Sequence, residues 1–304
     1  MVKPRSYHTG HATSDRHCSD QLSVTAFAHP ELIATTDWLA EHLGRPDLRI
    51  LDVRWRPDGT GPSAYATGHV PGAVHIDWRT DLTEPAEEGV AGLHLAAPGQ
   101  IASVLGHAGI GDGTSLVIYD DTLGLYAGRA WWSLRAYGYE AARILDGGLR
   151  AWTTEHRPVS NAIYEATPTT FTPRANARLR LTTSDIRASL GSSQTLLVDA
   201  RAAAEYRGLE GNARRLGHIP GAVNVPVGAM HDPATQKLRD AAVLKEMLLK
   251  ANVARGRRIV TYDGSGVGAA RLAFVLALLG YDDVAVYDGG WSEWGDRLDL
   301  PVDR

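Results

Sequence analysis

Two tandem α/β domains are the fold class that this sequence predicts, each with a mostly parallel sheet flanked by helices. Three observations support this prediction. The chain has 304 residues, four segments recur in the same order in its two halves, and short aliphatic runs alternate with amphipathic stretches. A chain of this length suits about two domains of ~150 residues each. Alternating strands and helices favour a parallel sheet whose ligands gather at the carboxyl ends of the strands.

The repeat is the strongest of the three observations. The segments read LDVR and VDAR, GHVPGAV and GHIPGAV, LVIYD and IVTYD, and ILDGGLRAW and VYDGGWSEW. In chain order they are Leu51–Arg54 with Val198–Arg201, Gly68–Val74 with Gly217–Val223, Leu116–Asp120 with Ile259–Asp263, and Ile144–Trp152 with Val286–Trp294. The spacing between the two copies drifts by several residues. This drift indicates two copies of one domain with loop insertions, and not a short-period solenoid.

The elements within each copy follow from hydrophobic periodicity. Short aliphatic runs bounded by turn residues are typical of buried parallel strands, and they occur at 49–53, 115–119, 142–145 and 284–287. Helical patterns occur at 36–43, 127–137 and 269–279. The helix predicted at 127–137 stops before Gly138, a residue type that commonly ends helices.

The domain boundaries follow from the repeats and from composition. We expect a first domain at 30–157 and a second at 181–304. Between them, 158–180 is rich in Thr and Asn and contains Pro158, Pro168 and Pro173. This composition predicts a linker that wraps one domain onto the other.

The first 29 residues predict a disordered extension. They are rich in Ser, Thr, His and Gly and lack the continuous apolar core of a secretory signal. An Arg- and Ser-containing targeting peptide is the alternative, and Asp15 and Asp20 argue against it. The chain contains one cysteine, Cys18, so an intrachain disulfide and a multi-thiolate zinc site are excluded.

The overall charge gives no reason to expect nucleic acid or an anionic membrane as a partner, because the net charge is -4. No apolar run approaches the ~20 residues that span a bilayer. We therefore expect a cytoplasmic protein with no membrane and no nucleic-acid partner.

The glycine-rich segment Tyr262–Arg271 is the candidate functional loop. It follows a predicted buried strand and opens a predicted helix. Its glycines, Gly264, Gly266 and Gly268, let the backbone turn so that successive N–H groups point into one concavity. Such a cradle, next to a helix N-terminus, holds an anion or stabilises a thiolate. A purely structural strand–helix turn is the alternative.

From about residue 30 to residue 300, the repeated segments make the chain resemble the rhodanese family, which includes thiosulfate and 3-mercaptopyruvate sulfurtransferases. The signatures are Gly-His-Ile-Pro-Gly-Ala, with Asp-Ala-Arg before it, and the late Tyr-Asp-Gly-Gly-Trp-Ser-Glu-Trp. The active loop of that family reads Cys-Gly-Ser-Gly-Val-Thr in mercaptopyruvate enzymes and Cys-Arg-Lys-Gly-Val-Thr in thiosulfate enzymes. Here Asp263-Gly-Ser-Gly-Val-Gly268 resembles the mercaptopyruvate form with two departures, Asp for the nucleophilic Cys and Gly for the final Thr.

The resemblance implies a sulfurtransferase that needs no metal or cofactor and that stores sulfur on the loop cysteine as a persulfide. A carboxylate cannot form that persulfide, and Cys18 lies far upstream. The first domain of the family is normally inactive, and Asp120 fits that pattern. We therefore expect Asp263 to be a structural anion in a protein with negligible sulfur transfer. The alternatives are a pseudoenzyme that binds an anion or a partner, an active enzyme with an introduced Cys-to-Asp change, and an Asp nucleophile.

The resemblance also implies a set of site residues around Asp263. Ser265 would assist proton transfer, and Gly264, Gly266, Val267 and Gly268 would form the cradle. Arg207 and either Arg214 or Arg215 would bind the carboxylate of a small sulfur-containing anion, because a guanidinium donates two parallel hydrogen bonds. His69 and Asp58 would reach the site from the first domain, whereas Asp199 and Arg201 form a structural pair. The thiol acceptor is not predicted.

Overall fold

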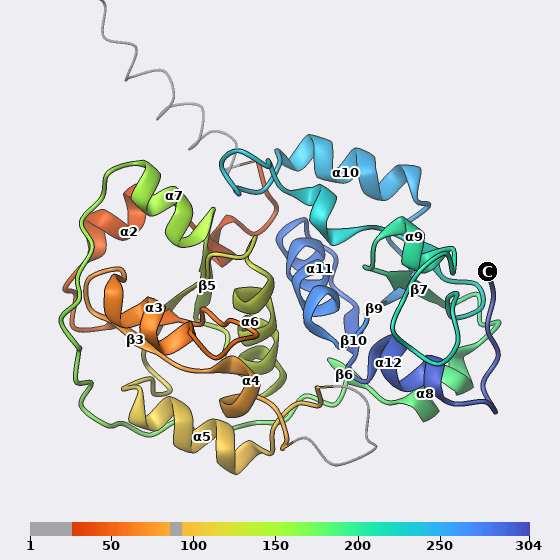
Figure 1. Cartoon of the computed structure of the whole chain (residues 1–304), viewed down its shortest axis with the longest axis horizontal. Coiled ribbons are helices and arrows are strands. Elements are labelled where there is room, and N and C mark those ends of the chain that lie inside the picture. The colour runs from red at the N-terminus through yellow and green to blue at the C-terminus, as the bar shows by residue number, and fades with distance from the viewer. Residues whose placement is uncertain (1–25, 86–92) are drawn as a thin grey trace, which may run out of the picture.

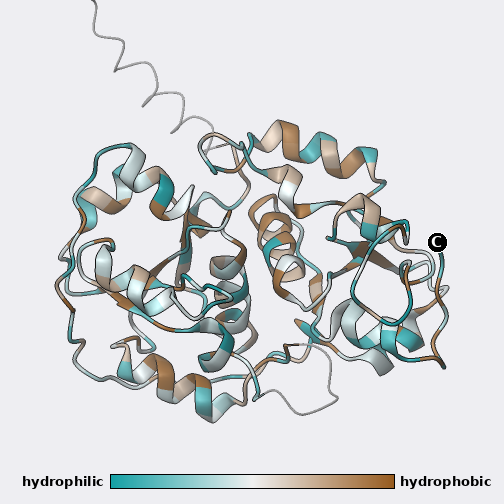
Figure 2. Ribbon diagram, in the orientation of Figure 1, coloured by the Kyte–Doolittle hydropathy of each residue, from teal (hydrophilic) through white to brown (hydrophobic). Residues whose placement is uncertain are grey.

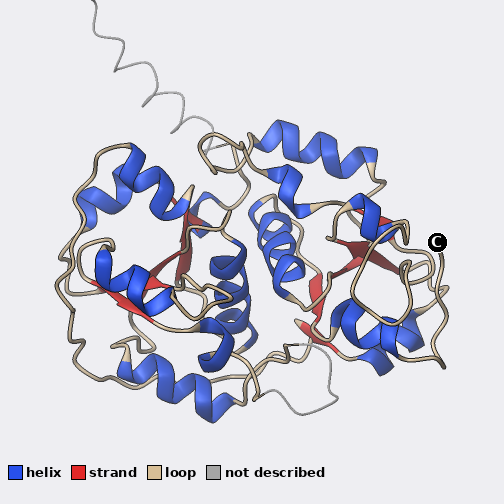
Figure 3. Cartoon of the chain, in the orientation of Figure 1, coloured by secondary structure: helices blue, strands red, loops and turns tan. Residues whose placement is uncertain are grey.

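The computed structural model describes residues 26–85 and 93–304, which fold into two α/β lobes (Figure 1). The predicted extension falls mostly on residues outside these ranges. Figure 3 shows strands inside each lobe and helices around them. No helix in the described ranges is both long and apolar enough to cross a bilayer.

The first domain contains a five-stranded parallel sheet in the order β1-β5-β4-β2-β3. Its strands are β1 (Ile33–Ala34), β2 (Leu48–Asp52), β3 (Ala73–His75), β4 (Ser115–Tyr119) and β5 (Ala142–Leu145). Its helices are the 3-10 turn η1 (Pro30–Leu32), α2 (Thr36–His42), α3 (Gly61–Thr67), α4 (Trp78–Asp81), α5 (Pro98–His107), α6 (Leu125–Ala136) and α7 (Gly148–Thr154). Thr35 caps α2, because its side chain accepts the N–H of Trp38 at 3.0 Å.

The second domain repeats this topology, with a parallel sheet in the order β6-β10-β9-β7-β8. Its strands are β6 (Arg180–Leu181), β7 (Thr195–Asp199), β8 (Val223–Asn224), β9 (Arg258–Tyr262) and β10 (Val284–Tyr287). Its helices are α8 (Thr183–Ser189), α9 (Ala203–Tyr206), the 3-10 turn η2 (Val227–Met230), α10 (Ala241–Lys250), α11 (Val267–Leu278) and α12 (Gly290–Asp296). The predicted fold class is therefore confirmed.

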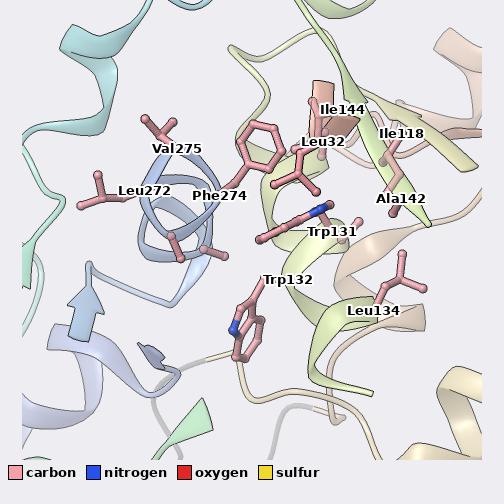
Figure 4. Close-up of a cluster of buried hydrophobic side chains, with 14 of the residues drawn as sticks. Leu32, Ile118, Trp131, Trp132, Leu134, Ala142, Ile144, Leu272, Phe274 and Val275 are labelled. Atoms are coloured by element: carbon pink, nitrogen blue, oxygen red, sulfur yellow. The ribbon is translucent and has the colours of Figure 1, made fainter. Parts of the chain in front are cut away.

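Helices α6 and α11 pack against each other and join the two domains (Figure 1). A Cβ on Gly128 of α6 would lie 2.8 Å from the Cα of Arg271, so the helix backbones approach closely there. Trp131 of α6 meets Phe274 of α11 edge to face, with ring centroids 5.1 Å apart (Figure 4). Figure 2 shows α11 to be largely hydrophobic. Its residues belong to one buried cluster that includes side chains of both domains.

The segment between the domains, 158–180, lies along the first domain before it enters β6. Ser160 pairs with His69 in an isolated antiparallel bridge. Further along, the N–H of Thr169 donates to the carbonyl of Gly106 at 3.0 Å, and the N–H of Arg174 donates to the carbonyl of Tyr137 at 2.8 Å. These backbone bonds satisfy polar groups of a segment with little secondary structure of its own.

Candidate functional site

Asp263 lies directly after β9, where the chain turns into α11. Gly266 caps that helix in the left-handed conformation, with φ 85° and ψ -3°. Glycine adopts this conformation without the steric cost that a Cβ imposes. The loop is therefore a tight strand–helix turn at the carboxyl end of a central strand, as its glycine content predicted.

The carboxylate of Asp263 accepts hydrogen bonds from its own loop. Its Oδ1 accepts the N–H of Ser265 at 3.2 Å and the N–H of Gly266 at 2.5 Å. Its Oδ2 accepts the N–H of Gly268 at 2.8 Å. The expected cradle is present, and the side chain of residue 263 fills it.

Two opposing effects act on the pKa of Asp263. Burial raises this pKa above its ordinary value, and the N–H groups of Gly268, Gly266 and Ser265 offset part of that rise. The nearby charge of Asp199 raises the pKa further. The sequence suggested that the cradle would stabilise the ionised form, but the cost of burying the charge outweighs the three hydrogen bonds.

A second set of contacts holds the loop from behind. The N–H of Trp291 donates to the carbonyl of Asp263 at 2.6 Å, and the N–H of Ser292 donates to the carbonyl of Gly264 at 2.9 Å. Gly290 has φ 60°, and a Cβ on it would lie 2.6 Å from the Asp263 carbonyl oxygen. The repeated Asp-Gly-Gly motif therefore provides a glycine where the start of α12 touches the loop.

The first domain repeats this arrangement around Asp120. Its Oδ1 accepts the N–H groups of Thr122 at 2.8 Å and Gly124 at 2.9 Å, and its Oδ2 accepts that of Ala127 at 2.9 Å. Burial also raises the pKa of Asp120. Gly148 touches the Asp120 carbonyl as Gly290 touches that of Asp263. Both domains therefore fold their loops around an aspartate.

Two of the predicted substrate-binding residues have other partners. His69 is fully buried, and its ring nitrogens lie 2.9 Å from the Tyr65 carbonyl oxygen and 3.2 Å from that of Ala162. Arg215 donates to the carbonyls of Trp294, Gly295, Arg297 and Leu300 and so fixes the end of α12. This geometry does not support the predicted roles, because backbone carbonyls already use these nitrogens and guanidinium N–H groups.

The other predicted residues have different surroundings. Ser265 and Val267 are half-buried in the loop. Arg207 is exposed at the end of α9, and Arg214 is exposed in the following loop. Asp58 is exposed, and its Oδ1 accepts the hydroxyl of Thr60 at 2.7 Å, which makes it a local turn residue. Of the predicted set, the loop residues 263–268 come together by hydrogen bonds, whereas the contacts of His69, Arg215 and Asp58 lie elsewhere.

The structural pair of Asp199 and Arg201 is confirmed. The Nη2 of Arg201 lies 2.6 Å from the Oδ2 of Asp199, and both side chains are buried. Asp52 and Arg54 form the same pair in the first domain, also at 2.6 Å. These pairs explain the repeated Asp-x-Arg motif without a catalytic role.

Sequence reasoning missed two residues at the loop. Arg129 of α6 donates to the carbonyl of Gly266 at 3.4 Å and to the carboxylate of Asp288 at 2.7 Å. The repeated Asp-Gly-Gly motif could have drawn attention to Asp288, but no local pattern marks Arg129. Among residues 26–85 and 93–304, no group of three or more His, Cys, Asp or Glu residues could hold a metal ion.

The fold and the site define a class of protein: two α/β domains, each with a turn after its central strand that presents backbone N–H groups to one anionic side chain. The sequence matches the rhodanese-like domain twice, over residues 35–155 and 182–297. The chain therefore belongs to the rhodanese family of sulfurtransferases.

Similar proteins agree with this assignment. The chain is 33% identical over 276 residues to a 3-mercaptopyruvate sulfurtransferase of Escherichia coli, a match that covers 88% of this chain and 96% of that one. It is 34% identical over 280 residues to a thiosulfate sulfurtransferase of Rattus norvegicus, with 87% and 92% covered. The crystal structure of the Escherichia coli 3-mercaptopyruvate sulfurtransferase SseA superimposes with a TM-score of 0.77 at 31% identity, with 86% and 99% covered.

Proposed function

We propose that this chain is a sulfurtransferase-family protein in which the carboxylate of Asp263 has replaced the sulfur-carrying thiolate, so that it has negligible sulfur transfer. The observation that supports this proposal is the set of three loop N–H groups donated to Asp263. In the family, the loop thiolate attacks the transferable sulfur of a donor. An S–S bond forms on the enzyme while the donor's bond to that sulfur breaks, and sulfite leaves from thiosulfate or the enolate of pyruvate leaves from mercaptopyruvate and takes up a proton.

Asp263 blocks this step in two ways. Its oxygen atoms cannot store sulfur as a persulfide that a thiol or cyanide then removes. Its carboxylate also occupies the N–H groups of Gly266 and Gly268, which would otherwise be available to an anionic donor such as thiosulfate or mercaptopyruvate. The same occupancy argues against the alternative in which an empty cradle binds a free anion.

Gly268 supports a naturally paired change at residue 263 over an isolated introduced one. A Cβ on Gly268 would lie 2.9 Å from Oδ2 of Asp263, closer than Cβ atoms normally approach an oxygen. A threonine, which the resemblance implies at this position, would therefore press against the carboxylate. The two departures from the family loop are sterically matched.

Other parts of the assignment remain proposals. Arg207 is exposed and is the remaining predicted arginine for the carboxylate of a small sulfur-containing anion. The loop sequence favours mercaptopyruvate over thiosulfate as the ancestral donor class. We also propose a cytoplasmic location.

Restoring the thiol tests the proposal. Asp263→Cys and the double variant Asp263→Cys with Gly268→Thr are assayed for thiocyanate formation from cyanide, with each donor in turn. All variants carry Cys18→Ser, so that the introduced cysteine supplies the only thiol. Asp120→Cys is the matched control, because Asp120 likewise accepts three loop N–H groups in the first domain.

We expect no thiocyanate from the unaltered chain or from Asp120→Cys, and activity from the double variant with mercaptopyruvate above thiosulfate. Robust thiocyanate formation by the chain that keeps Asp263 and lacks Cys18 would overturn the proposal. Failure of both thiol variants with both donors would show that more of the site than residues 263 and 268 has changed.

A further inference from the structure

A buried arginine of the first domain reaches the loop of the second. Arg129 on α6 is 0% exposed. Its Nη1 donates to Oδ1 of Asp288 at 2.7 Å and to the carbonyl of Gly266 at 3.4 Å. Its Nη2 donates to the carbonyl of Leu93, which belongs to its own domain. A fully buried guanidinium needs hydrogen-bond acceptors to offset its loss of water. Two of the three acceptors of Arg129, Asp288 and Gly266, belong to the second domain.

Arg129 and Asp288 enclose Gly266 at the start of α11. A Cβ on Gly266 would lie 2.7 Å from Nη1 of Arg129 and 2.9 Å from the carbonyl oxygen of Asp288. The glycine is therefore needed for space as well as for its φ of 85°. Gly266 also donates its N–H to Asp263. We therefore expect a displacement of the Arg129 guanidinium to displace this N–H group, which is one of the donors in the cradle.

Asp288, which pairs with Arg129, directly precedes the segment that contacts the loop carbonyls. Its Oδ2 accepts the N–H of Leu95 at 2.6 Å and lies 3.1 Å from Nε of Arg180. The residues that follow it begin α12, whose first N–H groups hold the carbonyls of Asp263 and Gly264. The loop is thus held on both sides by groups connected to Arg129.

The second domain has an arginine at the equivalent position, with different contacts. Arg271 follows the capping residue Gly266 by the same number of residues as Arg129 follows Gly124. Its side chain packs on Gly124, where a Cβ would lie 2.8 Å from Cζ of Arg271. Nη2 of Arg271 lies 3.0 Å from Nε2 of His231 in its own domain. Among the described residues, Nε and Nη1 of Arg271 have no hydrogen-bond partner, whereas in Arg129 only Nε has none.

We propose that Arg129 is a positioning residue, through which the first domain holds the N–H groups of Gly266 and Gly268 in the geometry that an anion at residue 263 requires. The inference deepens the proposed function, since it concerns the same loop, and gives the first domain a role there. Arg129 donates hydrogen bonds to the other domain, whereas Arg271 bonds within its own. The role is therefore assigned to Arg129 and not to both matched arginines.

Hydrogen exchange of the full chain tests this role without any assay of sulfur transfer. Peptides that cover 263–268 and 120–127 are compared by mass spectrometry in the unaltered chain, in Arg129→Met and in Arg271→Met. Peptides from β4 and β9 report global opening, which accelerates exchange everywhere. Arg129→Lys keeps the charge and loses the planar fork of donors.

We expect Arg129→Met to accelerate exchange at 263–268 by roughly tenfold relative to the strand peptides, with 120–127 unchanged. Arg129→Lys should show a smaller acceleration in the same peptide, and Arg271→Met none. Equal acceleration in the two loops, or acceleration no greater than in the strands, would overturn the proposal. If Arg129→Met does not fold, Arg129→Met with Asp288→Asn is used, because that pair removes both buried charges together.

A second readout uses Asp263→Cys in a Cys18→Ser background. A thiolate gains stability from the loop N–H groups, so its alkylation by iodoacetamide reports their placement. We expect Arg129→Met to slow alkylation at neutral pH several-fold, whereas Arg271→Met leaves the rate unchanged. An unchanged rate with Arg129→Met would contradict the proposal. Neither readout depends on whether the thiol variant transfers sulfur, so failure of the proposed function is recognised separately.

Discussion

Oδ2 of Asp263 lies where a side chain at residue 268 would begin. A Cβ on Gly268 would be 2.9 Å from that oxygen and 3.4 Å from Cγ1 of Val227. Gly268 lies within α11 and its φ is not positive, so the backbone itself tolerates a larger residue. The tight contact that disfavours a side chain there is with the carboxylate oxygen.

This relationship predicts a coupling between the two positions. Gly268→Ala should lower the free energy of unfolding of the unaltered chain by about 1 kcal/mol or more, because overpacking outweighs the gain in helix propensity. In the Asp263→Cys background the same change should be neutral or stabilising. Urea unfolding of the four proteins in this double-mutant cycle measures the coupling, and additive effects would contradict the steric argument.

The pKa of Asp263 predicts how stability depends on pH. Because burial raises this pKa in the folded state, the folded protein binds a proton at residue 263 more tightly than the unfolded chain does. The stability from that proton is fully present below the unfolded pKa and is lost as the pH rises through the folded pKa. Relative to Asp263→Asn, the unaltered chain should therefore lose stability as the pH rises from about 4 towards neutral.

Unfolding in urea at a series of pH values, with both proteins measured in parallel, checks this direction. Relative to Asp120→Asn, the unaltered chain should likewise lose stability as the pH rises, since burial raises the pKa of Asp120 as well. The stability of the unaltered chain relative to Asp263→Asn could instead increase as the pH rises. That result would mean that the loop N–H groups lower the pKa of Asp263 by more than burial raises it.

Substitution of Arg207 and of Arg215 should affect different properties, namely KM and the free energy of unfolding. Arg207 is exposed, so Arg207→Ala should leave the free energy of unfolding within ~0.5 kcal/mol of the unaltered chain. In the double variant that restores the thiol, it should raise KM for mercaptopyruvate. Arg215→Ala should lower stability by about 1–3 kcal/mol instead, because it leaves backbone carbonyls at the end of α12 without their donors. Unfolding curves and steady-state kinetics distinguish the two outcomes, and a reversed pattern would assign substrate binding to Arg215.

The sequence predicted the parts of the fold that depend on hydrophobic pattern. Aliphatic runs placed β4, β5 and β10 at their observed bounds, because buried strands need continuous apolar side chains. The two-residue edge strands β1 and β6 were not predicted. Strands this short have no periodicity of their own, and their pairing comes from the neighbouring strands β5 and β10.

The site was less predictable than the fold, because its geometry depends on the tertiary contacts of individual side chains. Glycine spacing and family resemblance located the cradle at 263–268, and the three hydrogen bonds that Asp263 accepts there agree with the prediction of a structural anion. The roles of His69 and Arg215 were predicted from the family resemblance, and tertiary packing gave both of them backbone partners. Arg129 is far from the loop in sequence and reaches it only because α6 packs on α11.

The buried cluster that continues across α6 and α11 has a consequence for how the chain can be divided. Phe274 of α11 is fully buried and packs against Trp131 of the first domain (Figure 4). A fragment limited to the second domain would place part of this apolar surface in water, where it favours aggregation. Despite their duplicated topology, the two halves should therefore unfold as one cooperative unit.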